Sequence, residues 1–155
     1  MNVGQVIELA QEWVETEGSQ TPDLYGAHLM GALNYLPRDA PFPAYKDVDL
    51  NLVVEGAPGD EPHEVFYKGL ILEYGTLDVE RYRSPATVLS DPGLASNLAV
   101  DSILSDPRGK LAMLQRVVER EYAQRRWVQA RCASAKNDVL QGLQGLQQAA
   151  SPDQA

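Results

Sequence analysis

The sequence has a single cysteine among its 155 residues, Cys132, so it can form neither an internal disulfide nor a cysteine-based zinc cluster. It has no apolar run close to the roughly 20 residues that cross a bilayer, and no charged-then-apolar leader at its start. Internal repeats are also absent. These absences predict a cytoplasmic protein that does not enter a membrane.

Basic residues are scarce as well. The chain has 13 lysine and arginine residues against 22 aspartate and glutamate residues, which gives a formal net charge of −9. This balance argues against general nucleic-acid binding, because phosphate contacts need a basic face. It does not exclude a nucleotide held by a metal ion and a few backbone amides. The length and the apolar share of 44% indicate one globular domain with an appended helical tail.

The residue pattern predicts an α+β fold, in which a small mixed β-sheet of four or five strands is flanked by helices and followed by a C-terminal helical segment. The predicted helices are 3–17, 85–90, 91–99 and two from residue 110 onward; the predicted strands are 24–30, 46–54, 102–104 and a hairpin within 65–77 that turns at Lys68-Gly69. We divide the chain into three parts. Residues 1–109 are expected to form an α/β domain, residues 110–148 a helical hairpin or tail, and residues 149–155 a frayed terminus.

Two aspartates at the start of the predicted strand 46–54 are the first candidates for a functional site. Asp47 and Asp49 are two residues apart in a strand, so their side chains share a face, with Cβ atoms roughly 7 Å apart. Like charges aimed at one place repel each other and raise each other's pKa unless a cation lies between them. A divalent metal ion would serve this purpose; the alternative is that both carboxylates simply face water.

A third carboxylate, Glu73, comes directly after the apolar run 70–72. Such a run is typical of a strand covered on both faces, so we expect Glu73 to lie inside the sheet and not at its edge. A buried carboxylate needs a cation, a hydrogen-bond network or a proton. A salt bridge to lysine or arginine and a metal ion are equally good candidates. Of the two histidines, His28 is expected in the core and His63 in solvent.

The C-terminal helix carries an apolar stripe at helical spacing. The stripe consists of Val128, Cys132, Ala135, Val139, Leu143 and Leu146. It predicts either core or a surface for another helix, and we expect a homodimer or a helical partner through 124–146. The basic residues of this helix are interpreted as a solvated face, with a phosphate clamp as the alternative. These are Arg125, Arg126, Arg131 and Lys136.

The order of these features resembles the nucleotidyltransferase superfamily, which includes DNA polymerase beta, and within it the aminoglycoside (antibiotic-modifying) nucleotidyltransferases. That signature is a strand ending in Gly-Ser, a variable loop, then Ser-Asp-hydrophobic-Asp, and a third carboxylate on a neighbouring strand. Here Gly31-Ala32, Lys46-Asp47-Val48-Asp49 and Glu73 stand in these three places. Residues 24–77 carry the match. The stretch 102–135 is also similar to the segment that comes after this domain in antibiotic-modifying members.

The resemblance implies Mg²⁺-dependent transfer of a nucleoside monophosphate from an NTP to a hydroxyl of a small molecule, such as an aminoglycoside, or of a protein. Asp47 and Asp49 would hold a metal ion under the triphosphate. Glu73 would complete the second of two Mg²⁺ sites and draw the proton from the acceptor hydroxyl, so Asp49 and Glu73 would be the catalytic pair. The turn at Gly31 would bring backbone N–H groups to the phosphates.

The chain departs from the signature at two positions that would adjoin the nucleotide. Ala32 replaces the serine whose hydroxyl would bond a phosphate, and Lys46 replaces the serine before the first aspartate. The Lys46 ammonium would either compete with Mg²⁺ or hold a phosphate. A second function therefore stays open, in which a catalytically weakened nucleotidyltransferase-like domain serves as a nucleotide-binding or protein-interaction module. The second helical domain of aminoglycoside-type members is missing or reduced to 110–148.

Overall fold

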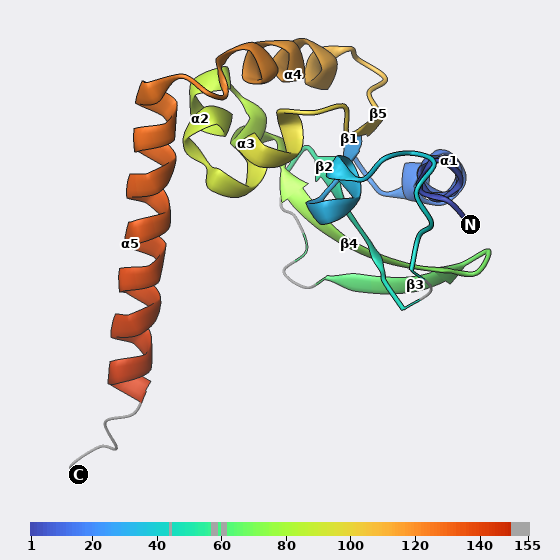
Figure 1. The fold of residues 1–155 in the computed structure, drawn as a ribbon, viewed down its shortest axis with the longest axis horizontal. Helices are drawn as coiled ribbons and strands as arrows, with labels where there is room; N and C mark the ends of the chain where they lie inside the picture. The colour runs from blue at the N-terminus through green and yellow to red at the C-terminus, as the bar shows by residue number, and fades with distance from the viewer. Residues whose placement is uncertain (44, 57–58, 60–61, 150–155) are drawn as a thin grey trace.

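The protein folds around a five-stranded mixed β-sheet (Figure 1). The computed structural model describes residues 1–43, 45–56, 59 and 62–149. The strands are β1 (Leu24–Leu29), β2 (Val48–Val54), β3 (His63–Tyr67), β4 (Leu70–Asp78) and β5 (Ile103–Ser105). Their order in the sheet is β3-β4-β2-β1-β5; β2 and β4 are parallel, and the other neighbours are antiparallel. The predicted α+β class is confirmed.

Helices lie on both faces of the sheet. The α-helices of the described residues are α1 (Val3–Thr16), α2 (Pro85–Ser90), α3 (Pro92–Leu98), α4 (Lys110–Glu121) and α5 (Arg125–Ala149). The short 3₁₀ helices are η1 (Gly18–Gln20), η2 (Gly31–Tyr35) and η3 (Val79–Tyr82). Residues 150–155, which make up most of the predicted frayed terminus, lie outside the described residues.

The side chains of β2 alternate between the two faces of the sheet, and this alternation decides on which face Asp49 lies. Leu50 and Leu52 are buried in the core that packs against α1. Val53 points the other way, into a second core formed with α2, α3 and α4. Because strand side chains alternate, Asp49 and Asn51 lie on the same face as Val53.

The first helix also fixes the path of the proline-rich segment that leads into β2. The N–H of Val3 donates to the carbonyl oxygen of Ala40 at 2.9 Å. The N–H of Gly4 donates to the carbonyl oxygen of Arg38 at 2.8 Å. These bonds use backbone donors of the first helical turn, which have no partner within the helix. The long loop before β2 is therefore attached to α1.

On the second face, α4 packs directly on β1 at Gly26. A Cβ atom built on Gly26 would lie 2.5 Å from Leu111 Cδ1 and 2.7 Å from the carbonyl oxygen of Ser105. The absence of a side chain therefore lets Leu111, which is buried, sit against the strand.

The expectation that β4 is covered on both faces is wrong at Ile71. Leu70 and Leu72 are buried, but Ile71 is 38% exposed, because the three side chains alternate and the open face is not covered at this end of β4. Glu73 shares the face of Ile71 and is therefore half-buried. The strand β4 is still second in the sheet order, so Glu73 lies away from the edge, as predicted.

The helix α5 packs against α2 and α3, and its C-terminal half extends away from the other elements (Figure 1). Arg131 helps to hold it, because its guanidinium donates to the carbonyl oxygens of Leu89 at 3.1 Å and Tyr122 at 2.7 Å. The interpretation of the basic residues as a solvated face is therefore wrong for Arg131, which is half-buried, whereas Arg125 and Lys136 are exposed.

The apolar stripe of α5 is exposed and does not belong to the core. Val139, Leu143 and Leu146 are 63%, 51% and 69% exposed, and Cys132 is exposed as well. Within the described part of the chain, no helix combines the length and the hydropathy that crossing a membrane requires.

Candidate metal centre

Three carboxylates meet at the start of β2. One oxygen from each of Asp47, Asp49 and Glu73 can be chosen so that all lie within 4.8 Å of one another. Asp47 is exposed and directly precedes β2, whereas Asp49 and Glu73 are half-buried. Asp49 pairs with Glu73 across the parallel strands β2 and β4, which puts both side chains on one face. The structure thus brings together the three acidic residues that the sequence analysis singled out.

The surroundings of Asp49 disfavour the negative charge of its carboxylate. Burial raises the pKa of the Asp49 carboxyl, and the charge of Asp47 raises it further, while the ammonium of Lys46 acts in the opposite direction. Glu73 takes part in no ion pair among the described residues, so a salt bridge does not neutralise it. Carboxylates crowded in this way favour a cation between them, and an all-oxygen ligand set suits a hard divalent ion such as Mg²⁺.

The turn after β1 closes one side of the acidic cluster. Gly31 has a left-handed backbone with φ +69°, and a Cβ atom there would lie 3.1 Å from Asp49 Oδ2, so glycine leaves room for the carboxylate. The Gly31 N–H donates to the side-chain oxygen of Asn97 at 2.9 Å. The expected contact of this N–H with a phosphate would therefore require that bond to open. Ala32 is exposed beside it.

A pocket of about 260 Å³ opens next to the carboxylates. Its lining residues are Met30, Gly31, Asp49, Leu50, Asn51, Pro62, Glu73 and Gly75. The register of β2 and β4 sets part of this lining, because Asp49 pairs with Glu73 and, two residues further along, Asn51 pairs with Gly75. The carboxylates of Asp49 and Glu73 in the pocket therefore adjoin the carboxamide of Asn51 and the backbone of Gly75.

Sequence reasoning missed three residues of this region. Asn97 holds the Gly31 turn from a position 66 residues further along the chain, and no local pattern marks it. Gly75 interrupts a strand, a signal of close approach that can be read from sequence. Asn51 also had a signal, because it is a polar residue in an apolar strand, two positions after Asp49 and hence on the same face.

A buried polar pair lies on the same face of the sheet. His28 is fully buried, which confirms its predicted place in the core. Its Nδ1 lies 2.9 Å from the carbonyl oxygen of Leu29, and its Nε2 lies 2.7 Å from the hydroxyl of Tyr82. A carbonyl oxygen can only accept, so Nδ1 carries the proton and Nε2 accepts from Tyr82. Burial lowers the pKa of His28 to about 4, against the opposing effect of its hydrogen bond to the Leu29 backbone.

Stability should therefore fall as the pH is lowered from about 6.5 toward 4. In this window the unfolded chain binds a proton at His28 and the folded chain does not, so unfolding is favoured by up to about 3 kcal/mol at the acid end. Urea denaturation at a series of pH values measures the slope.

The His28→Gln variant removes this titration, and its stability should depend less on pH in the same window. His63→Gln is the matched control, because His63 is exposed, as predicted, and its replacement should leave the slope unchanged. A wild-type slope retained in His28→Gln would contradict the buried neutral histidine.

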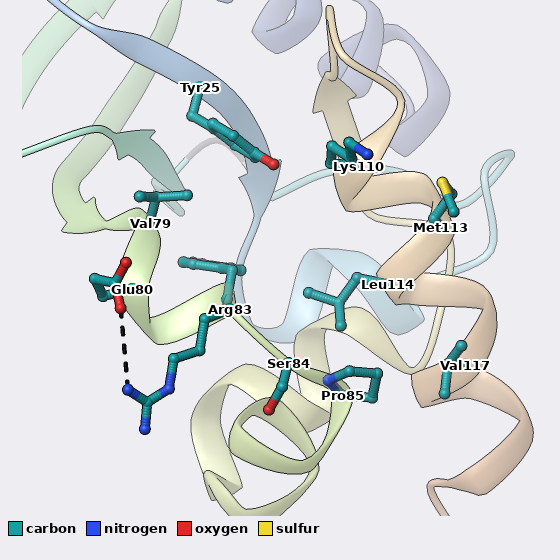
Figure 2. A pocket seen from close by; sticks show the side chains of 11 residues that line it. Tyr25, Val79, Glu80, Arg83, Ser84, Pro85, Lys110, Met113, Leu114 and Val117 are labelled. Carbon is teal, nitrogen blue, oxygen red and sulfur yellow. Dashed lines mark ion pairs between the residues drawn. The ribbon is translucent and has the colours of Figure 1, made fainter.

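A second pocket, of about 360 Å³, lies between residues 79–85 and α4 (Figure 2). Its lining is largely apolar, with Leu114 and Val117 contributed by α4. Arg83 and Glu80 form an ion pair with each other at 4.0 Å. The acidic group that could hold a metal ion is not in this pocket; it lies at Asp47, Asp49 and Glu73, beside the pocket that Asp49 and Glu73 line.

No family model matches the sequence, and no curated protein matches it either. The function of the site therefore has to be inferred from its residues and their geometry.

Proposed function

We propose that the protein is a Mg²⁺-dependent nucleotidyltransferase that transfers a nucleoside monophosphate from an NTP to a hydroxyl of a small molecule or a protein, with pyrophosphate as the leaving group. One observation carries the proposal. Asp47, Asp49 and Glu73 offer carboxylate oxygens within 4.8 Å of one another, where the start of β2 pairs with the parallel strand β4. Carboxylates are the protein ligands that Mg²⁺ uses where it handles substrate phosphates.

Each of the three acidic residues would have its own role. Asp47 and Asp49 would hold the metal ion on which the triphosphate sits, and a bound Mg²⁺ offsets the negative charge of the phosphate oxygens. Glu73 adds a further ligand oxygen and lies in no ion pair among the described residues, so its carboxylate is able to accept the proton of the acceptor hydroxyl. The adjoining pocket supplies room for substrate.

A second function, nucleotide or partner binding by a catalytically weakened domain, is favoured by two residues. Ala32 offers no hydroxyl beside the Gly31 turn. The positive charge of Lys46 lies close enough to Asp49 to affect the pKa of its carboxyl, so it is in range to compete with a metal ion. In this function the pocket would bind an NTP without transferring its nucleotide.

The test is incubation of the full chain with each of the four labelled NTPs, Mg²⁺ and a panel of hydroxyl acceptors that includes aminoglycosides and proteins. Transfer of label that a chelator removes is the expected result. Mg²⁺-dependent NTP binding without any transfer would support the weakened domain. The double variant Ala32→Ser, Lys46→Ser should then bind NTP several-fold more tightly, because it restores a hydroxyl and removes a competing cation. Absence of nucleotide binding in both proteins would contradict the transferase and the nucleotide-binding form of the second function.

We also propose that residues 124–146, nearly all of which belong to α5, contact another chain, either a second copy or a helical partner. The support is the exposure of Val139, Leu143 and Leu146 on a helix that extends away from the remaining elements. Contiguous exposed apolar side chains of this kind mark interaction surfaces.

A further inference from the structure

Asn51 is the polar residue that the proposed reaction leaves unused. It lies between Leu50 and Leu52 in β2, where both neighbours are buried, and it is itself only 5% exposed. Its side-chain nitrogen is buried and makes no hydrogen bond among the described residues. Burial of a carboxamide is unfavourable unless its N–H and C=O groups form hydrogen bonds, so an asparagine in an apolar strand requires an explanation.

The neighbours of Asn51 across the sheet differ on its two sides. On β4 its partner is Gly75, and on β1 its partner is His28. A Cβ atom built on Gly75 would meet only Asn51 Oδ1, at 3.9 Å, so the space above Gly75 is open toward the side-chain oxygen. This open space belongs to the pocket that Asp49 and Glu73 also line. The amide oxygen therefore borders the pocket.

The other side of the amide faces the buried pair His28 and Tyr82. The Tyr82 hydroxyl donates its proton to His28 Nε2, which leaves its oxygen as an acceptor. Burial raises the pKa of the Tyr82 hydroxyl, whereas the side-chain amide of Asn51 lowers it, as a nearby N–H donor would. The open space at Gly75 lies toward the oxygen of Asn51, so its nitrogen lies on the side of Tyr82, where it makes no hydrogen bond among the described residues.

We propose that Asn51 recognises the sugar of the bound nucleotide, with its side-chain oxygen accepting a hydrogen bond from a ribose hydroxyl. The inference rests on the proposed function, because it takes the position of the nucleotide from phosphates held at Asp47 and Asp49. Asn51 lies about 6.6 Å further along β2 than Asp49, and the sugar is the next group of a nucleotide after its phosphates. Tyr82 and His28 lie on the inner side of the amide and would not touch the nucleotide.

The test compares each of the four NTPs with its 2′,3′-dideoxy counterpart, in the presence of Mg²⁺, by isothermal titration calorimetry on the full chain. The wild-type protein should bind the NTP that it accepts about tenfold more tightly than the dideoxy form, which corresponds to about 1.4 kcal/mol. Asn51→Leu, a replacement of similar volume, should bind the two forms equally.

The outcomes separate this inference from the function on which it rests. Failure of the wild-type protein to bind any NTP with Mg²⁺ would overturn both. Equal wild-type affinity for an NTP and its dideoxy form would overturn the role of Asn51 alone, as would a ratio retained in Asn51→Leu.

Discussion

Replacing Asp49 by asparagine should abolish nucleotidyl transfer while leaving the fold intact. Asp49 offers a carboxylate oxygen within 4.8 Å of those of Asp47 and Glu73, and the variant removes this negative charge from the proposed ligand set of a divalent ion. We expect a loss of roughly 10³-fold or more, which corresponds to about 4 kcal/mol of transition-state stabilisation. The measurement is the labelled-NTP transfer assay, beside thermal unfolding with and without Mg²⁺.

The same change should raise the stability of the metal-free protein by about 0.5 to 1 kcal/mol, because it removes one of several like charges that face one another across the strands. Mg²⁺ should raise the melting temperature of the wild type and not that of Asp49→Asn. The matched control is Glu64→Gln, which also removes a carboxylate opposite Glu73 but one that is exposed and outside the cluster, so it should keep both transfer and the Mg²⁺ response. Transfer that survives in Asp49→Asn would show that the chemistry occurs elsewhere.

Replacing Gly26 by alanine should destabilise the fold by about 2 to 3 kcal/mol. The new methyl group would come within 2.5 Å of Leu111 Cδ1 and 2.7 Å of the backbone oxygen of Ser105. Leu111 is buried and has little room to move, and the backbone of β5 is held by its pairing with β1. Equilibrium unfolding in urea measures the loss.

The matched control for this variant is Gly142→Ala. No atom lies within 4 Å of the Cβ that it would add, and Gly142 is exposed on α5. Alanine is the better helix former, so this variant should be as stable as the wild type or gain up to about 1 kcal/mol. Wild-type stability in Gly26→Ala would mean that α4 does not sit on β1 in the way described.

Local pattern was enough to predict the elements that carry the site. The alternation of side chains predicted that Asp47 and Asp49 share a face; the strand begins only at Val48, but the Asp47 carboxylate still reaches the cluster. The strand and hairpin around Glu73 are explained by their apolar runs and the turn at Lys68-Gly69. That turn has positive φ at both residues. Glycine adopts this conformation readily and therefore indicates it in a sequence, whereas lysine does not.

Local pattern could not supply the contacts between distant segments. Whether Glu73 meets Asp49 depends on the register of two strands that are parallel and not consecutive in the chain. The same holds for Asn97, which reaches the Gly31 turn from α3. Ile71 was placed wrongly because an unbroken apolar run does not tell which faces of a strand other elements cover.

Because Asp49 pairs with Glu73, the acidic centre depends on the number of residues between these two positions as well as on which residues occupy them. Side chains of a strand repeat every two residues, so sliding β4 by a single position against β2 would turn Glu73 toward α1 and put Tyr74 in its place. A one-residue insertion or deletion near the hairpin could therefore dismantle the centre without replacing any acid. Natural variation and engineering in this region should be judged by the number of residues between Asp49 and Glu73, in addition to their identity.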